Sequence, residues 1–240
     1  MTGASSGIGR TLAIELSKKY RVILHGRDMA RLQEVLGSCA GSNHLIWACD
    51  LNNVADLEQN LKEFIQENSL EVEQFVHCAG FMKMVPLKMS TVDILTQTFN
   101  INVIAASLIT KTLTAKKVNN AALKGAVFIS SNLSNMGAKA MSAYGASKGA
   151  IDTLMRCLAV ELGPKVRVNS VLPGAVITEM TKAIFENEEV KARMSAMYPL
   201  GIGEAEDIYQ MVDFLLSPNA KWITGQQFTV DGGRSINITG

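Results

Sequence analysis

The sequence has few of the residues that several common classes of protein need. Its 240 residues include four cysteines, and Cys39, Cys49, Cys78 and Cys157 show no spacing typical of a metal or redox site. A formal net charge of +1 gives no electrostatic reason to bind nucleic acid or an anionic membrane surface. Polar residues interrupt the apolar stretches before the ~20 residues that a membrane span needs, and no basic-then-apolar signal segment opens the chain. The sequence therefore predicts a soluble, cytoplasmic protein with reduced thiols and no metal.

Histidine is equally scarce, and its placement bears on a possible hydrolase. Both Gly3–Gly7 and Gly145–Gly149 match G-x-S-x-G, the nucleophile elbow of α/β-hydrolases. Hydrolases of that fold need a histidine after the serine and the acid in chain order. The last histidine is His77, which precedes the second elbow, and the first elbow stands at the extreme N-terminus. This order argues against a hydrolase.

Apolar runs alternate with helical patterns along the chain, which is typical of a doubly wound, parallel α/β sheet of the Rossmann type. With 48% hydrophobic residues and no dividing linker, residues 1–240 are predicted to form a single domain. A ligand of such a sheet binds beyond the carboxyl ends of the strands. The predicted strands are Arg21–Leu24, His44–Cys49, Gln74–Cys78, Gly125–Ser130, Arg167–Val171 and Gln227–Val230. The predicted helices begin near Ile8, Met29, Val54, Thr91, Ser142 and Glu204.

Tyr144 and Lys148 are the most informative pair in the chain. Residues four apart share a helix face, so the Lys148 ammonium can lie near the Tyr144 phenol. A phenol ionises near pH ~10, and an adjacent cation lowers that pKa. Tyr144 would then donate and accept protons at neutral pH, with Ser131, after a predicted strand, holding a reacting oxygen. The alternative is that Tyr144 only packs in a helix and Lys148 is solvated.

A glycine-rich N-terminal segment supports the interpretation of Tyr144 and Lys148 as functional. Its glycines permit a tight turn and a close approach of the backbone to a pyrophosphate, and the helix that follows supplies N–H donors and a positive dipole. Such a turn alone is weak evidence, but together with the downstream serine, tyrosine and lysine it is strong. The residues predicted to contact a cofactor here are Gly3, Ser5, Ser6, Gly7, Ile8 and Gly9.

Together these motifs resemble the short-chain dehydrogenase/reductase family over nearly the whole chain. The family's T-G-x-x-x-G-x-G loop matches Thr2–Gly9, and its Y-x-x-x-K matches Tyr144–Lys148. Its catalytic serine falls on Ser131 and its active-site asparagine on Asn102. Within the family, Pro173–Lys182 is most similar to 3-oxoacyl-[acyl-carrier-protein] reductases of fatty acid biosynthesis.

The resemblance implies a role for each member of the site. Ser131 and Tyr144 would hydrogen-bond the substrate oxygen, Lys148 would hold the nicotinamide ribose, and Asn102 would anchor a proton-relaying water. The further cofactor-binding residues that it implies are Asp50, Leu51, Ala79, Gly80, Pro173, Gly174, Ile177 and Thr178. In the family's N-N-A-G segment, His77 and Cys78 replace both asparagines, which removes amides that usually pin neighbouring strands.

The segment that follows the predicted strand Arg21–Leu24, the second strand in the family's order, indicates which nicotinamide cofactor binds. An acid there would accept hydrogen bonds from an adenosine ribose and repel a 2′-phosphate. The matching position is Gly26, followed by Arg27, and arginine is suited to a phosphate but cannot accept a ribose hydrogen bond. The sequence therefore predicts NADP(H), with Arg27 at the phosphate. The alternative is that Arg27 is a solvated loop charge.

The substrate is predicted from one segment. Residues 179–198 are expected to form a small helical flap. Its apolar residues either line an acyl channel or serve ordinary packing of the core or the flap, and they are Met180, Ile184, Phe185, Met194 and Met197. Lys182, with Lys124, would contact an acidic acyl carrier protein, although Ile202 stands where many relatives have arginine. The expected reaction is NADPH-dependent reduction of a 3-oxoacyl thioester. The alternatives are a sugar, steroid or other small carbonyl, or a non-catalytic NADP(H)-binding module.

Two further expectations concern the ends and the assembly of the chain. Family members carry a strand before the glycine turn, whereas only Met1 precedes Thr2 here. We expect this sequence to lack that first strand, because the rest of the pattern is intact. The resemblance also implies a homotetramer, packed through the helices that begin near Thr91 and Ser142. Small residues there would allow close approach, namely Ala105, Ala106, Ala146, Gly149 and Ala150.

Overall fold

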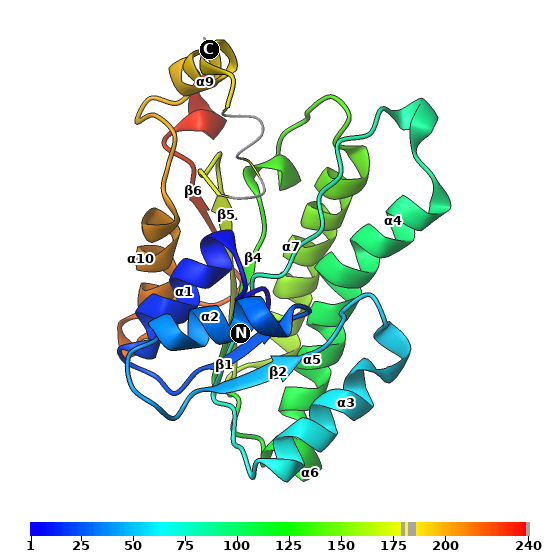
Figure 1. The fold of residues 1–240 in the computed structure, drawn as a ribbon, viewed down its shortest axis with the longest axis vertical. Helices are drawn as coiled ribbons and strands as arrows, with labels where there is room; N and C mark the ends of the chain where they lie inside the picture. The colour runs from blue at the N-terminus through cyan, green and yellow to red at the C-terminus, as the bar shows by residue number, and fades with distance from the viewer. Residues whose placement is uncertain (179–180, 182–185, 239–240) are drawn as a thin grey trace.

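Six parallel strands make up the sheets of the computed structural model, which describes residues 1–178, 181 and 186–238 (Figure 1). Each strand lies within two residues of a predicted apolar run, so the expected doubly wound α/β fold is confirmed. Within the described residues the strands are β1 (Ile23–Gly26), β2 (Leu45–Ala48), β3 (Gln74–His77), β4 (Gly125–Ile129), β5 (Arg167–Pro173) and β6 (Gln227–Val230). β1 pairs with β2, and β3, β4, β5 and β6 pair in that order.

Helices cover both faces of this layer. One core lies between the strands and α1 (Gly7–Ser17), α2 (Met29–Ser38) and α10 (Ala205–Leu216). The second core lies between the strands and α3 (Val54–Glu67), α5 (Ala105–Thr114) and α7 (Ser142–Leu162). The other helices in the described part of the chain are α4 (Val92–Phe99), α6 (Lys116–Asn119) and α9 (Glu188–Ala196). A π-turn lies at Asn100–Ile104, and short 3₁₀ turns lie at Leu87–Met89, Asn132–Ser134, Pro218–Ala220 and Arg234–Ile236.

The strand β4 shows why the two cores form. Its burial is complete, and its side chains alternate between the layers because successive residues of a strand point to opposite faces. Phe128 enters the core beside α3, α5 and α7, whereas Val127 and Ile129 enter the core beside α1, α2 and α10. A continuous apolar run is therefore the pattern expected of a strand covered on both faces.

Met1 and Thr2 lie between β1 and β3. The Met1 carbonyl accepts a hydrogen bond from His25 N at 3.0 Å, and Thr2 N donates to the Val76 carbonyl at 2.9 Å. Thr2 also forms an isolated parallel bridge with His77. A cavity of ≈ 330 Å³ lies next to Met1 and is lined by the first residues of β1 and β3. Two residues thus join the two-stranded and four-stranded sheets at the glycine-rich turn.

His77 supplies the strand-pinning contacts that the sequence left in doubt. Its Nε2 lies 3.1 Å from the Ile101 carbonyl, and its Nδ1 lies 3.0 Å from Thr2 Oγ1. A carbonyl only accepts, so Nε2 carries the proton and Nδ1 accepts from the Thr2 hydroxyl. Burial lowers the pKa of His77 to about 3, which keeps the ring neutral. One imidazole therefore ties the N-terminal segment to the π-turn.

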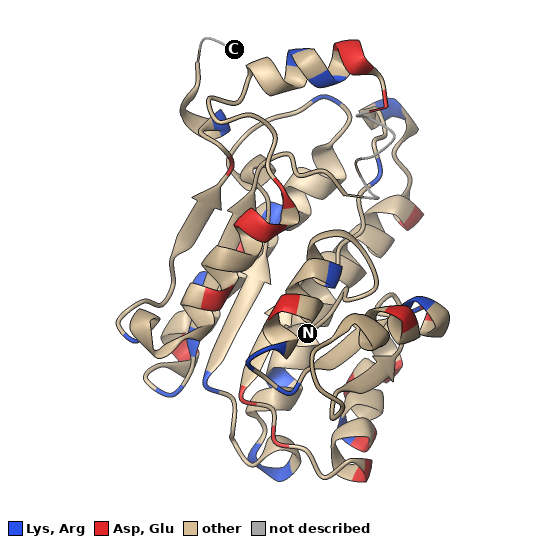
Figure 2. Cartoon of the chain, turned by 60° about the vertical axis from the view of Figure 1, so that its left-hand side comes forward, with Lys and Arg blue, Asp and Glu red and all other residues tan. Residues whose placement is uncertain are grey.

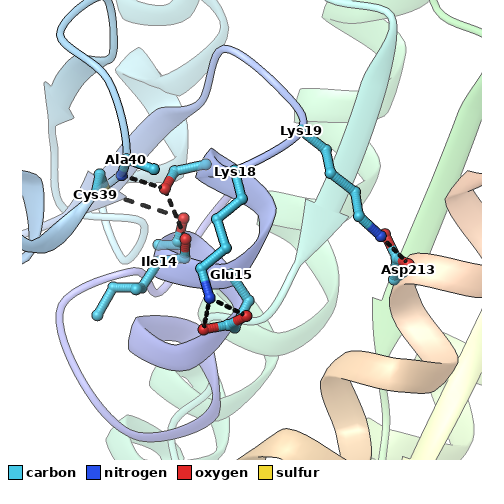
Figure 3. A network of polar contacts seen from close by, with 9 residues as sticks. Ile14, Glu15, Lys18, Lys19, Cys39, Ala40 and Asp213 are labelled. Carbon is cyan, nitrogen blue, oxygen red and sulfur yellow. Dashed lines mark hydrogen bonds and ion pairs between the residues drawn. The ribbon is translucent and has the colours of Figure 1, made fainter.

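Polar contacts at the C-terminal end of α1 fix the helix that carries the glycine-rich turn (Figure 3). Lys19 pairs with Asp213 of α10 at 2.6 Å, and Lys18 pairs with Glu15 at 2.7 Å. The Ser17 hydroxyl accepts from Ala40 N at 2.7 Å, in the loop after α2. The helix is therefore held against both of its neighbours on this face of the sheet.

Charged residues lie on the helices and loops, with both signs interspersed, while the strands are almost free of charge (Figure 2). α4, the π-turn and α5 form one continuous helix, Val92–Thr114, which is long and apolar enough to span a membrane by length and composition. This helix is an exception to the prediction that polar residues interrupt every such stretch. Its second half buries Ala105, Ala106 and Leu113 in the protein core, as a core helix does.

Candidate active site

A cavity of ≈ 510 Å³ opens at the carboxyl ends of the strands. All but two of the predicted site residues line this cavity. Those that line it are Gly3, Ser5, Ser6, Gly7, Ile8, Gly9, Arg27, Asp50, Leu51, Ala79, Gly80, Ser131, Tyr144, Lys148, Pro173, Gly174 and Thr178. The two exceptions are Asn102, which is buried behind the wall, and Ile177, which is 49% exposed. The fold therefore gathers residues that are far apart in the sequence.

The glycine-rich turn has the geometry of a backbone anion site. Gly3 and Gly7 adopt φ of +71° and +51°, which residues with a Cβ rarely adopt. A Cβ on Gly9 would lie 1.9 Å from the Gly3 carbonyl oxygen. The Ser6 side chain makes no capping hydrogen bond, so it does not cover the N–H groups that begin α1. This cradle fits a pyrophosphate in the way that helix N-termini bind anions.

The end of β1 provides a cation but no acid. Arg27 lines the cavity and is exposed. A Cβ on Gly26 would already lie 3.2 Å from Ser5 Oγ, so a larger acidic side chain there would be crowded. Asp28 accepts hydrogen bonds from Ala30 N and Arg31 N as the N-cap of α2, and it does not line the cavity. Arg10, on α1, pairs with Glu34 at 3.7 Å.

Ser131, Tyr144 and Lys148 meet where β4 ends and α7 begins. The Ser131 hydroxyl contacts the Tyr144 phenol and accepts a hydrogen bond from Leu133 N at 3.2 Å. Lys148 Nζ lies 5.5 Å from the centre of the Tyr144 ring. It donates a hydrogen bond to the Ile129 carbonyl at 2.8 Å and is only 4% exposed.

The two pKa values differ from the sequence expectation. Burial raises the pKa of Tyr144 to about 12, and the Ser131 hydrogen bond lowers it only in part. Burial also lowers the pKa of Lys148 to about 8. In this state Tyr144 is a neutral phenol that holds a transferable proton, and Lys148 is an ammonium at neutral pH.

Asn102 has a different placement from the other predicted catalytic residues. Its Oδ1 accepts from Phe81 N at 2.7 Å, while its Nδ2 lies 3.1 Å from the Phe81 carbonyl and 2.9 Å from Ser147 Oγ. A Cβ on Gly80 would lie 3.7 Å from both Asn102 Oδ1 and Lys148 Nζ. Asn102 therefore supports the wall on which Lys148 lies, and its hydrogen bonds explain its position in the π-turn.

Pro173 and Gly174 form the floor opposite the glycine-rich turn. A Cβ on Gly174 would lie 2.7 Å from Asp231 Cβ, so only glycine fits beside the C-terminal loop. Thr178 lies next to Gly7, where a Cβ on Gly7 would be 3.1 Å from Thr178 Cβ. Thr181, which the sequence did not single out, contacts the Thr178 hydroxyl at 3.2 Å and also lines the cavity.

The remaining wall contains side chains that the sequence did not assign to the site. They include the apolar residues Phe81, Met82, Met84, Leu133, Met141 and Tyr198. Met194, which was predicted to line an apolar channel, also lies in this wall, whereas Met197 does not. The Tyr198 hydroxyl accepts from Ala175 N at 3.0 Å, which joins the end of the predicted flap to the loop after β5. The flap contains α9, but Met180, Lys182, Ile184 and Phe185 lie outside the described residues. No local sequence pattern marks these wall residues, because they come together from separate loops.

Comparisons with known proteins agree with this architecture. Residues 3–235 match the family model described as Enoyl-(Acyl carrier protein) reductase. The 3-oxoacyl-[acyl-carrier-protein] reductase of Bos taurus is 32% identical over 98% of this chain and 97% of its own. The L-xylulose reductase of Bos taurus is 31% identical over 97% of this chain and 94% of its own.

Solved structures give the same assignment. A 4-hydroxyisoleucine dehydrogenase complexed with NADH superposes with a TM-score of 0.91 at 26% identity, over 98% of this chain and 97% of that one. The chain belongs to the short-chain dehydrogenase/reductase family, which confirms the resemblance seen in its motifs. It is an oxidoreductase of the α/β type, and the glycine-rich cradle fits a nicotinamide cofactor.

Proposed function

We propose that this protein is an NADPH-dependent reductase that converts a ketone to a secondary alcohol through Ser131, Tyr144 and Lys148. The observation that carries the proposal is that Ser131 and Tyr144 lie together on the cavity wall, with the buried Lys148 ammonium 5.5 Å from the centre of the Tyr144 ring. All three line the cavity that the glycine-rich cradle shares. A module that only binds the cofactor would not need this arrangement.

The residues would divide the reaction between them. A reduced nicotinamide bound beside Pro173 and Gly174 supplies a hydride for the carbonyl carbon. The Ser131 and Tyr144 hydroxyls hydrogen-bond the carbonyl oxygen and stabilise the negative charge that develops there. Tyr144 donates its phenolic proton to this oxygen, and solvent returns a proton to the phenolate. Lys148 stabilises the phenolate and holds the nicotinamide ribose hydroxyls.

The preference for NADPH rests on the end of β1. Arg27 lines the cavity, Gly26 carries no carboxylate, and Asp28 is engaged as a helix cap. A 2′-phosphate would therefore meet an arginine and no carboxylate at this position. The NADH-complexed relative shows that nicotinamide cofactors bind in this fold, and Arg27 supports the phosphorylated form here.

The substrate that we propose is a 3-oxoacyl thioester, as in the 3-oxoacyl-[acyl-carrier-protein] reductase relative. The methionines Met82, Met84, Met141 and Met194 give the wall beyond Tyr144 an apolar, adaptable surface that suits an acyl chain. Ile202, which stands where many relatives have arginine, weakens the case for a carrier protein as the donor of that chain.

A sugar or another small carbonyl is the second candidate, and the similarity to L-xylulose reductase favours it equally at the level of sequence. NADPH oxidation should be measured with an acetoacetyl thioester, a 3-oxoacyl carrier protein, L-xylulose and a steroid ketone. We expect the thioesters to give the highest kcat/KM. If L-xylulose is reduced and no thioester is, the proposed substrate is wrong, but the proposed reductase chemistry is supported. No turnover of any carbonyl would overturn the proposed function.

We also propose a homotetramer, for which exposed apolar side chains give the support. Leu87 and Met89, in the 3₁₀ turn before α4, are 79% and 62% exposed, and Val92, the first residue of α4, is 76% exposed. Ala105 and Ala106, by contrast, are fully buried within the protomer, so the expectation that they form a subunit contact is wrong. Light scattering at micromolar concentration should give the mass of four chains, and a stable monomer would contradict the assembly.

A further inference from the structure

Two oppositely charged side chains are buried one turn apart on α7. Asp152 is 1% exposed and Lys148 is 4% exposed. Among the residues that the structure describes, Lys148 is the only buried lysine or arginine, and Asp152 and Asp231 are the only buried carboxylates. Burying a charge is costly unless it is paired or well hydrogen-bonded. The two buried carboxylates are stabilised in different ways.

Asp231 is satisfied by hydrogen bonds alone. Its carboxylate accepts from Gly233 N, Ser235 N and Ser235 Oγ, and Asn132 Nδ2 lies 3.4 Å away. Asp152 Oδ2 accepts one hydrogen bond, from Ser130 Oγ at 2.9 Å, and Asp152 Oδ1 has no partner in the described part of the chain. Hydrogen bonding therefore leaves Asp152 undersatisfied, and the nearby Lys148 ammonium is the charge that can compensate it.

The contacts of the two residues converge on two consecutive positions at the end of β4, Ile129 and Ser130. Lys148 Nζ donates to the Ile129 carbonyl at 2.8 Å. Ser130 Oγ donates to Asp152 at 2.9 Å and lies 3.2 Å from the Lys148 carbonyl. Ser131 follows directly and contacts the Tyr144 phenol. The segment that presents Ser131 is thus held on α7 by both members of the buried pair.

We propose that Asp152 is a positioning residue of the reaction, whose carboxylate keeps the buried Lys148 ammonium protonated and, through Ser130, holds the end of β4 beside Tyr144. The inference rests on the proposed function, since Lys148 acts there as a cation. It assigns a role to an acid that does not line the cavity and touches neither substrate nor cofactor.

Among the titratable groups around Lys148, Asp152 is the one that can act as its countercharge. Burial lowers the pKa of Lys148 to about 8, while Cys78 and Asp152 act in the opposite direction. Burial raises the pKa of Cys78 to about 12, so this thiol carries no charge at neutral pH. Burial likewise keeps His77 neutral, with a pKa of about 3, and Tyr144 neutral, with a pKa of about 12. Asp152 alone among these groups supplies negative charge to Lys148.

The first test is the pH dependence of reduction in Asp152→Asn. Asparagine retains an oxygen that accepts from Ser130 but removes the charge. In the wild type, kcat/KM should fall on the basic side near the Lys148 pKa of about 8. Loss of the carboxylate should move this fall to lower pH by about one unit, because a nearby opposite charge shifts a pKa by ~1–3 units. An unchanged profile, with activity lowered equally at every pH, would overturn the proposal.

Two variants separate the charge from other effects. Glu161→Gln removes an exposed carboxylate from the same helix and should leave the profile unmoved. Ser130→Ala removes the hydrogen bond but keeps the Asp152 charge, so the basic fall should stay near the wild-type pH. A shift in Glu161→Gln equal to that in Asp152→Asn would mean that general charge loss, and not Asp152, sets the profile.

A second measurement needs neither substrate nor turnover. In protein labelled with ε-¹³C-lysine, the Lys148 resonance is assigned by its absence in Lys148→Met and titrated in the wild type and Asp152→Asn. A lower pKa in the variant supports the proposal even if the proposed function fails. An equal pKa refutes the proposal even if the enzyme is a reductase.

Stability provides a test if Asp152→Asn does not fold. Lys148→Met leaves Asp152 buried without its cation, and adding Asp152→Asn removes that uncompensated charge. We expect the double variant to be more stable to urea than Lys148→Met alone. A double variant less stable than Lys148→Met would show that Asp152 is not paired with Lys148.

Discussion

The two ends of the cavity differ in what lines them, since one is formed by backbone and the other by side chains. The phosphate end is made of backbone, where Gly3, Gly7 and Gly9 allow close approach and the start of α1 supplies donors. The substrate end is made of side chains such as Met141, Met194 and Tyr198, which arrive from separate loops. A backbone cradle tolerates almost no substitution, whereas an apolar wall tolerates changes that keep its volume. The residues that we propose to react, Ser131, Tyr144 and Lys148, line the same cavity.

The largest effect should come from Tyr144, the proposed proton donor. Tyr144→Phe removes the proton and one hydrogen bond but keeps the ring, and general acid–base groups contribute ~10²–10⁴-fold. We expect kcat to fall within that range, while NADPH affinity, measured by fluorescence, changes little. A variant that retains more than about a tenth of the wild-type kcat would contradict Tyr144 as the acid, since it falls outside this range.

The rigidity of the phosphate end can be tested with a matched pair of glycines. Gly9→Ala would place a Cβ 1.9 Å from the Gly3 carbonyl oxygen, so the turn must shift and cofactor affinity should be lost. Gly37→Ala, in α2, meets nothing within 4 Å and should stabilise the protein by about 0.4–1 kcal/mol. Urea unfolding and cofactor titration give both values. Normal cofactor binding by Gly9→Ala would remove the distinction drawn between the two ends.

A smaller effect is expected at the edge of the phosphate end. Arg27→Ala removes the cation that lines the cavity where a 2′-phosphate would lie. A charge-assisted hydrogen bond contributes about 1.5–3 kcal/mol, so NADPH affinity should fall by ~10–150-fold while NADH affinity is nearly unchanged. Calorimetric titration of both cofactors measures this. Equal losses for both, or a wild-type preference for NADH, would show that Arg27 does not select the cofactor.

The smallest effect should appear at the substrate end. Met194→Ser replaces a flexible apolar side chain in the wall with a small polar one. The KM of a long 3-oxoacyl thioester should rise about 5-fold, because one apolar group contributes about 1 kcal/mol at the low end of its range. The KM of an acetoacetyl thioester, which does not reach the flap, serves as the control. An equal rise for both substrates would place Met194 at the reacting centre rather than along the chain.

Local patterns accounted for most of the fold. The predicted starts at Met29, Val54 and Ser142 agree with the structure, and every predicted strand is present. The reason is that strands covered on both faces require continuous apolar runs, and helices require an apolar stripe. The strand ends were less accurate, since β1 begins at Ile23 and not at Arg21. A strand ends where its pairing partners end, which no single run can show.

The sequence alone determined the glycine-rich turn, the pairing of Tyr144 with Lys148 and the arginine at the end of β1, because each depends on residues close together in the chain. Tertiary structure decided the properties that depend on distant partners. Burial raises the Tyr144 pKa instead of lowering it, and His77 replaces a lost amide through contacts with Thr2 and Ile101. Desolvation and long-range hydrogen bonds arise only when the layers pack, so the chemistry at neutral pH is a property of the folded protein.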